Sequence, residues 1–269
     1  NKTVNPLALI LLVIMGVTPM IRFKKDQLSR IKKPLIFMAI AALIMGPLSN
    51  AAYAMYVNGL NHNNEPPLAL INPMVTLTLI LCYWVFFGIF AEIAMHKPRN
   101  ASFIKGFFTQ SMSRVAMNLG HFGTVILIIG ITMTSYYSVE ADRLLRVGQT
   151  EAVQGYDFKL ENLQDIKGPN YTATKGTFSV SFQGEFLRMM YPEKRIYAAS
   201  GMPISEIALR ASLLDDLYIA LSEERPGESW AIRLYVKPFI RWIWLGGIIM
   251  AIAAVVAIFS LRRPERAEK

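Results

Sequence analysis

The chain has 269 residues, of which 53% are hydrophobic and 17% charged, a composition that excludes most soluble enzymes and is typical of a membrane protein with one polar domain. Its formal net charge is +9, yet residues 139–236 hold 11 basic and 14 acidic side chains, while the rest hold 17 basic and 5 acidic. The basic excess therefore lies beside apolar segments, which indicates membrane topology and argues against nucleic-acid binding.

Five apolar segments follow one another along the chain. Each is long enough to cross a bilayer as a helix, for which about 20 apolar residues suffice. The sequence thus predicts an α-helical integral membrane protein with about five transmembrane helices, four of them in residues 1–138 and the last in residues 237–269, which also hold a basic tail. The segments cover residues 3–21, 34–56, 66–91, 115–138 and 242–261.

The orientation follows from where the basic side chains lie. They gather between the first and second segments, after the third, and in the C-terminal tail, whereas VNGLNHNNEPP, between the second and third, has no lysine or arginine. The positive-inside rule assigns the three basic regions to the cytoplasm. The C-terminus is therefore expected in the cytoplasm and residues 139–236 outside. Because no initiator Met or signal peptide precedes the first segment, we expect Asn1 to be an internal position of a longer polypeptide or the start of a split subunit; a processed N-terminus is the alternative.

The pattern of the polar domain, residues 139–236, predicts β structure. Residues 177–182 alternate polar and apolar, Gln183 and Gly184 offer a turn, and residues 185–190 form a return strand. We therefore predict a small antiparallel β barrel or sandwich inserted between the last two helices. Further strand-like pieces are 144–147, 156–160, 195–198, 217–221 and 230–236, while 205–214 fits either a helix or a strand. The aromatic residues expected to anchor the ends of the domain against membrane lipid are Tyr136, Tyr137, Phe239, Trp242 and Trp244.

His121 is the one histidine within the fourth apolar segment, which holds no formally charged side chain. Burying an ionisable group at membrane depth costs several kcal/mol unless it is bound or paired, so it marks a candidate functional site. If Arg114 marks the membrane surface, the helical rise of about 1.5 Å per residue puts His121 roughly 10 Å below it. The small neighbours Gly120 and Gly123, with Asn118 one turn earlier, leave room for a bulky partner. A neutral imidazole is a good axial ligand of haem iron; a helix–helix hydrogen bond and a proton relay are the alternatives.

The other candidate side chains are expected to have structural roles. Cys82 is the only cysteine, so it can form no disulfide or CxxC pair within the chain and is expected to be an apolar core residue. His62 belongs to the outer loop. His96 follows Glu92 by four residues, which predicts a solvated surface pair at a helix end. The polar domain contains no histidine and cannot build a Ser/His/Asp triad from its own residues.

Several stretches together resemble the C-terminal part of the CcmF family, the integral-membrane subunit of the bacterial cytochrome c haem lyase. The resemblance implies a bacterial inner-membrane protein with a periplasmic β domain. It also implies that the lyase takes haem from a periplasmic haem chaperone and supports thioether attachment of haem to the CxxCH motif of apocytochrome c. The stretches are NLGHFG (118–123), GPNYTA (168–173), YPEKRIY (191–197), EIALR with DDLYIAL (206–221) and RLYVKPFIRWIWLGG (233–247).

The family holds a haem b between two membrane histidines. The histidine of NLGHFG matches one of them, so the resemblance assigns His121 as an axial ligand of haem iron. Asn118, Gly120 and Gly123 become neighbours that pack against the haem. The family's tryptophan-rich WWD segment, its outer-loop haem histidines and the second haem b ligand have no counterpart in this sequence, which makes the chain an incomplete enzyme, a subunit or fragment of the lyase.

The partners implied are the remaining N-terminal half of the lyase, the haem chaperone, a thiol-handling subunit that binds apocytochrome, and apocytochrome c itself. Arg195, Tyr197 and Arg210 are candidates for contacts with these partners, and roles in the fold are the alternative. Two other functions stay open: a paralogous haem lyase dedicated to a nitrite-reductase-type multihaem cytochrome, and a transporter or scaffold without haem.

Overall fold

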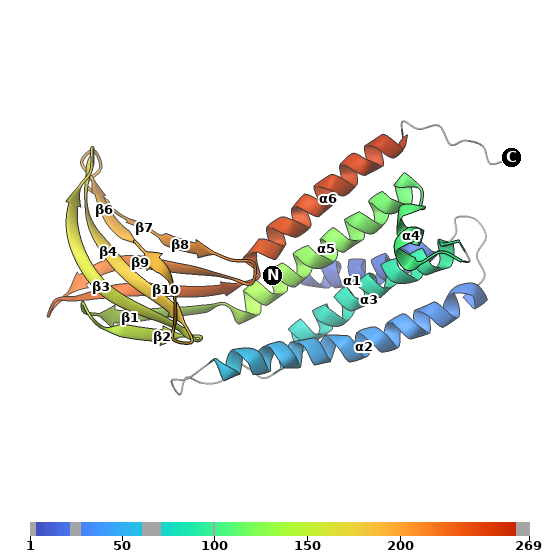
Figure 1. Ribbon diagram of the computed structural model, residues 1–269, viewed down its shortest axis with the longest axis horizontal. Coiled ribbons are helices and arrows are strands. Elements are labelled where there is room, and N and C mark those ends of the chain that lie inside the picture. Colours follow the sequence, from blue (N-terminus) through green and yellow to red (C-terminus); the bar gives the residue numbers. More distant parts are fainter. Residues whose placement is uncertain (1–3, 22–27, 61–70, 99, 262–269) are drawn as a thin grey trace. The chain divides into compact units, whose positions relative to one another are not determined.

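The computed structural model describes residues 4–21, 28–60, 71–98 and 100–261, and Figure 1 shows its helices and strands. The chain divides into two compact units. One consists of Asn1–Tyr53, Ile71–Thr132 and Arg241–Lys269, and the other of Ala54–Leu70 and Met133–Ile240. The first unit is helical, and the second contains all the described strands together with the ends of helices α2 and α5.

Four helices in the described part of the chain, α2, α3, α5 and α6, are long and apolar enough to cross a membrane. The first apolar segment instead forms a helix of 14 residues followed by a short 3-10 turn. Its described length is below the roughly 20 residues that span a bilayer. The helices are α1 (Val4–Val17), η1 (Thr18–Met20), α2 (Leu28–Gly59), α3 (Pro73–His96), α4 (Phe103–Phe108), α5 (Met112–Tyr137) and α6 (Ile240–Leu261).

Helix α3 begins later and ends later than residues 66–91, where the sequence predicted it. Asn72 caps its start, because the side-chain Oδ1 accepts the backbone N–H groups of Met74 at 2.9 Å and Val75 at 3.3 Å, and Pro73 occupies the first helical position, where proline is favoured. Most of the loop before α3, with His62, lies outside the described residues. The short helix α4, between α3 and α5, was not predicted.

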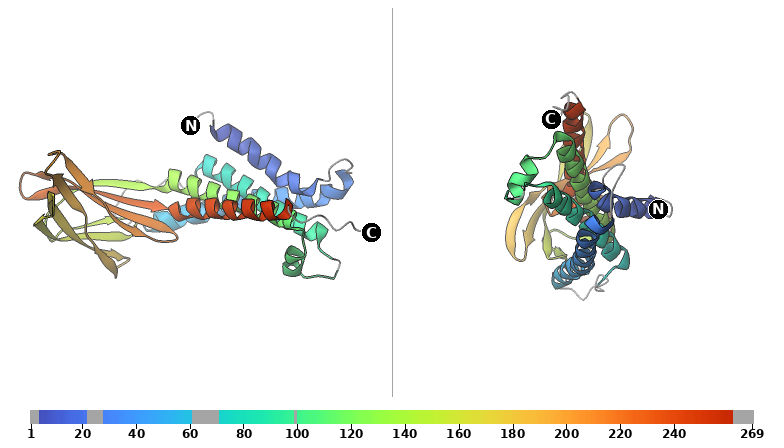
Figure 2. Two further views of the ribbon diagram at one scale, coloured as in Figure 1. Left: turned by 90° about the horizontal axis from the view of Figure 1, so that it is seen from above. Right: turned by 90° about the vertical axis from the view of Figure 1, so that its right-hand side faces the viewer.

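Close helix contacts hold the helical unit together. The Nε1 of Trp84 on α3 donates to the carbonyl of Val13 on α1 at 3.1 Å. Cys82 is buried beside Leu12, Val85 and Val125, which confirms its prediction as an apolar core residue. Figure 2 shows α5 and α6 side by side. The Oγ atoms of Ser113, near the start of α5, and Ser260, near the end of α6, lie 3.2 Å apart, so the two helices run antiparallel.

The second unit is a sandwich of two antiparallel sheets. One sheet has the strand order β1-β10-β9-β8, and the other β2-β3-β4-β6-β7, with β5 paired to β4. Fully buried side chains from both sheets, Phe158, Phe178 and Leu217 among them, form one apolar core. The strands are β1 (Val139–Leu145), β2 (Thr150–Val153), β3 (Tyr156–Lys167), β4 (Tyr171–Phe182), β5 (Glu185–Met190), β6 (Glu193–Tyr197), β7 (Pro203–Glu206), β8 (Ala208–Ala211), β9 (Asp215–Arg225) and β10 (Ser229–Pro238).

The predicted β4–β5 hairpin is confirmed. Its loop residues Gln183 and Gly184 have φ values of 49° and 83°, the left-handed values that a tight two-residue hairpin loop requires. The ambiguous residues 205–214 are not helical and lie in the region of two short strands, β7 and β8. The predicted fold class, a helical membrane protein with an antiparallel β domain between its last two helices, is confirmed.

Candidate functional site

His121 lies in the first half of α5 with its imidazole half-buried. Its Nδ1 atom is buried and has no hydrogen-bond partner among the described residues. The alternative of a helix–helix hydrogen bond through this imidazole therefore has no counterpart in the described part of the molecule. A buried ring nitrogen without a partner instead suits a side chain that an additional group completes.

The two glycines that flank His121 have different surroundings. At Gly123 an added Cβ would lie 2.9 Å from the carbonyl oxygen of Gly246 and 2.8 Å from the Cγ of Met250, both on α6. At Gly120 the nearest heavy atom, the Cβ of Ala253, would be at 3.9 Å, an ordinary contact. The contact with α6 thus accounts for Gly123, whereas a Cβ at Gly120 would meet its neighbour only at ordinary contact distance.

A buried carboxylate lies close to this segment. The sequence predicted a solvated pair between Glu92 and His96, and that prediction is wrong because Glu92 is 0% exposed. Its Oε2 accepts hydrogen bonds from Gln110 Nε2 at 2.6 Å and Asn118 Nδ2 at 3.0 Å. Its Oε1 lies 3.2 Å from His96 Nδ1 and 3.8 Å from the half-exposed Arg114 Nε. These nitrogen atoms come from three parts of the helical unit, α3, the connection before α5 and α5 itself, and they surround the buried carboxylate.

Asn118 belongs to this polar cluster. It is 2% exposed, and its Nδ2 donates to Gln110 Oε1 at 3.1 Å as well as to Glu92. The sequence marked Asn118 only as a neighbour that packs against haem, and it missed Glu92 and Gln110 as members of a cluster. The signal available was a glutamate close to the end of an apolar run, which is costly to bury without donors.

Among the described histidines of this unit, His121 is the one whose Nδ1 has no hydrogen-bond partner. His96 is engaged with Glu92, also through a 2.9 Å contact of its Nδ1 with the Glu92 carbonyl, and His62 lies outside the described part. No group of three or more His, Cys, Asp or Glu side chains able to hold a metal ion occurs among the described residues. The imidazole of His121 is of a kind that fits haem iron as a ligand.

The candidate partner-binding side chains of the β sandwich have partners within it. Arg195 forms ion pairs with Glu193 at 2.8 Å and Glu206 at 3.3 Å and lies over the ring of Tyr171. The carboxylate of Glu193 is the main cause of the raised pKa of Arg195. Tyr197 packs against Tyr171, with ring centroids 5.5 Å apart. These contacts fit roles in the fold, and partner binding by Arg195 and Tyr197 stays a prediction.

Arg210 pairs with Asp215 at 3.5 Å. Asp215 also accepts the hydroxyl of Tyr156 at 2.6 Å. Burial of Tyr156 is the main cause of the raised pKa of its phenol, and this hydrogen bond is the second cause. The cluster ties β3 to the start of β9, so Arg210 has a structural role here, and a further role in partner binding stays a prediction.

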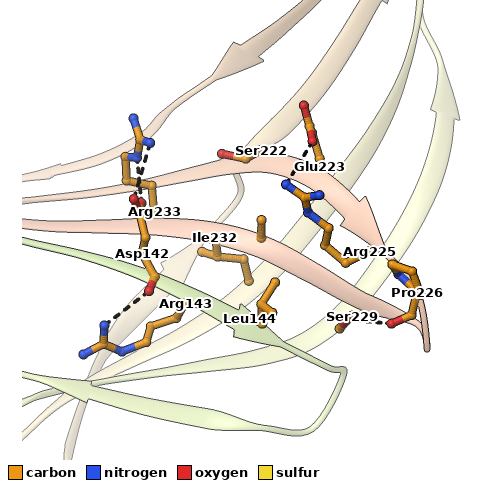
Figure 3. Close-up of a pocket in the computed structure, with 11 residues that line it drawn as sticks. Asp142, Arg143, Leu144, Ser222, Glu223, Arg225, Pro226, Ser229, Ile232 and Arg233 are labelled. Atoms are coloured by element: carbon orange, nitrogen blue, oxygen red, sulfur yellow. Dashed lines mark hydrogen bonds and ion pairs between the residues drawn. The ribbon is translucent and has the colours of Figure 1, made fainter.

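A hollow of about 790 Å³ lies on the sheet formed by β1, β9 and β10 (Figure 3). Four of the five charged side chains that line it pair with one another: Arg233 Nε lies 2.7 Å from Asp142 Oδ1, and Arg225 lies 3.3 Å from Glu223. Its lining contains no histidine or cysteine. Exposed ion pairs of this kind are weak, and the hollow offers no catalytic set.

Comparisons with known proteins agree with this architecture. Residues 136–238 match the family described as the CcmF C-terminal beta-sandwich. The cytochrome c-type biogenesis protein CcmF of Haemophilus influenzae is 32% identical over 250 residues, which cover 93% of this chain and 36% of that protein. The cytochrome c-type biogenesis protein NrfE of the same organism is 34% identical over 154 residues, 57% of this chain and 24% of that protein.

A solved structure described as cytochrome c heme lyase CcmF has a TM-score of 0.67 to this chain at 18% identity, covering 96% of this chain and 40% of the other; this similarity concerns the fold. The fold and these matches define a helical membrane protein with a β sandwich of the CcmF type between its last two helices. Residues 136–238 belong to the CcmF C-terminal β-sandwich family, and over most of its length the chain is similar to CcmF proteins. It spans a little over a third of the length of the CcmF relatives it matches.

Proposed function

We propose that the chain acts in cytochrome c biogenesis as part of a membrane haem lyase, in which His121 is one axial ligand of a haem b. The observation that carries the proposal is the half-buried imidazole of His121, whose Nδ1 has no described partner, within a chain that matches CcmF proteins over most of its length. When bound, the haem supplies redox chemistry; the protein binds and orients it. The complete lyase would take haem from a periplasmic chaperone and support addition of the two CxxCH thiols of apocytochrome c across the haem vinyl groups.

We place the protein in the bacterial inner membrane with the β sandwich in the periplasm and the C-terminus in the cytoplasm. One residue separates α5 from β1, and one residue separates β10 from α6, so both ends of the sandwich join spanning helices. Described basic residues lie at the start of α2 (Arg30, Lys32 and Lys33), after α3 (Lys97) and near the start of α5 (Arg114). The positive-inside rule supports this orientation.

The partners follow from the same proposal. A second axial histidine and the tryptophan-rich haem-handling segment come from the remaining N-terminal half of the lyase, and the sandwich helps position apocytochrome c or the thiol-handling subunit that binds it. The relatives' names support a role in cytochrome c biogenesis.

The test is cytochrome c maturation in cells whose own gene for this protein is deleted. Complementation with His121→Ala is expected to lose most of the covalently bound haem seen on denaturing gels of periplasmic and membrane cytochromes. The control is Ile131→Ala, on the same helix with an exposed side chain, which should mature cytochromes normally. Normal maturation by His121→Ala at equal protein level would refute the proposal.

A second candidate is a lyase dedicated to the multihaem cytochrome of a nitrite reductase. The match to NrfE over 154 residues favours it, although the CcmF match extends over 250 residues. The same deletion strain distinguishes the two, because a dedicated lyase would leave most other c-type cytochromes intact and remove only the multihaem one.

A further inference from the structure

The amide of Asn118 has a fixed orientation. Gln110 Nε2 donates to Glu92 Oε2 at 2.6 Å, which leaves Gln110 Oε1 as an acceptor. Asn118 Nδ2 then donates both to Glu92 Oε2 at 3.0 Å and to Gln110 Oε1 at 3.1 Å. With its NH₂ group committed to two acceptors, the Oδ1 of Asn118 faces elsewhere, and it is buried without a hydrogen-bond partner in the described part of the chain.

A matching donor lies one turn along the same helix. His121 Nδ1 is also buried without a partner among the described residues. Residues three apart on a helix are neighbours on its surface, and helical side chains lean toward the N-terminus, so the imidazole leans toward Asn118. A buried acceptor and a buried potential N–H donor, neither with a hydrogen-bond partner among the described residues, therefore lie three positions apart on α5, the spacing at which helical side chains are neighbours.

We propose that Asn118 is the positioning residue of His121: its Oδ1 accepts the Nδ1–H, directly or through one water, when Nε2 holds the haem iron. This inference rests on the proposed role of His121 as a haem ligand. A metal-bound histidine usually donates its other ring N–H to such an acceptor, which fixes the tautomer and the ring orientation and raises the basicity of the ligand. Glu92 and Gln110 act through Asn118, because they hold its amide in the accepting orientation.

The electronic consequence has a definite sign. A stronger acceptor at Nδ1–H makes the imidazole more electron-rich, which stabilises ferric over ferrous iron and lowers the reduction potential of the haem. Removing the acceptor does the opposite. The sign of the change separates this role from general damage to the helix packing, which has no reason to reverse sign between two variants.

The test uses two variants of the protein purified from its own membranes with its co-purifying partners. Asn118→Leu removes the acceptor and is expected to weaken haem binding about 10- to 100-fold, the usual effect of losing such a partner, and to raise the haem midpoint potential. The double variant Glu92→Gln/Asn118→Asp keeps a donor–acceptor pair between α3 and α5 and gives Nδ1–H an ionised acceptor, so it should lower the potential. Redox titration with the visible spectrum measures both.

The matched control is Thr132→Val, a near-isosteric change at another buried polar position of α5, which should leave the potential unchanged. Opposite shifts in the two Asn118 variants support the inference; shifts of the same sign, or none, overturn it. His121→Ala measured in parallel separates the two proposals. If it loses haem while the Asn118 variants keep the wild-type potential, only the positioning role fails; if it keeps haem, the ligand role and the inference fail together.

Discussion

Replacing Gly123 by alanine is expected to force α5 and α6 apart, whereas the same change at Gly120 is not. The new Cβ at 123 would lie 2.9 Å from a carbonyl oxygen and 3.0 Å from a backbone nitrogen of α6, and backbone atoms cannot turn aside. Such overpacking costs typically about 1–3 kcal/mol. Both changes also gain about 1 kcal/mol of helix propensity, so the free energies of unfolding of the two variants should differ by about 1–3 kcal/mol, with Gly123→Ala the less stable.

Unfolding by sodium dodecyl sulfate in mixed micelles, followed by circular dichroism, measures the difference. Membrane helices associate largely through such close packing, so the comparison tests the contact directly. The same test can be repeated on α6: a Cβ at Gly246 would lie 2.6 Å from the carbonyl oxygen of Gly123, whereas at Gly247 it would meet nothing within 4 Å. Equal stabilities within either pair would refute the packing of α5 against α6 described above.

Three further predictions concern other parts of the molecule. Phe158→Ala should destabilise the sandwich by about 3–5 kcal/mol, since Phe158 is 0% exposed; amide hydrogen exchange measures this, and an effect no larger than that of the exposed Phe186→Ala would contradict it. The raised pKa of Tyr156 means that its neutral form stabilises the fold below about pH 10, the ordinary tyrosine value, and that this stability is lost as the pH rises through the higher folded pKa. Wild type should therefore lose more sandwich stability above pH 10 than Tyr156→Phe, and parallel losses would disprove this. Asn72→Ala should cost about 0.5–2 kcal/mol by removing the cap of α3, measured by the same detergent titration; an unchanged midpoint would exclude the cap.

The sequence could predict those features that depend on residues close together in the chain. Long apolar runs predicted the helices able to span a membrane, because the length and hydrophobicity of a run can be seen in the run itself. Alternation followed by Gln183 and Gly184 predicted the β4–β5 hairpin. Strand β1 was predicted too late, at residues 144–147, because it begins at Val139 directly after α5 without a turn signal. Its pairing with β10, in which Val139 faces Val236, is a long-range contact.

The environment of Glu92 could not be predicted in this way. The spacing to His96 is a local pattern, and it suggested a solvated pair. The donors that bury the carboxylate lie 18 and 26 residues further along the chain, so only the packing of α3, α5 and the connection between them brings the cluster together. Likewise, the residues that contact Gly123 belong to α6, which follows the whole β sandwich in the chain. The sequence alone singled out His121, whereas the hydrogen bond from Asn118 to Glu92 became visible only in the fold.

The central claim is that His121 ligates a haem b. The most direct measurement is the visible spectrum of the protein purified with its co-purifying partners, in the wild type, His121→Ala and His121→Gly. The account predicts a six-coordinate low-spin haem b spectrum in the wild type, its loss or strong weakening in both variants at maintained protein level, and partial recovery in His121→Gly when free imidazole is added. A wild-type spectrum that persists unchanged in both variants would contradict the claim.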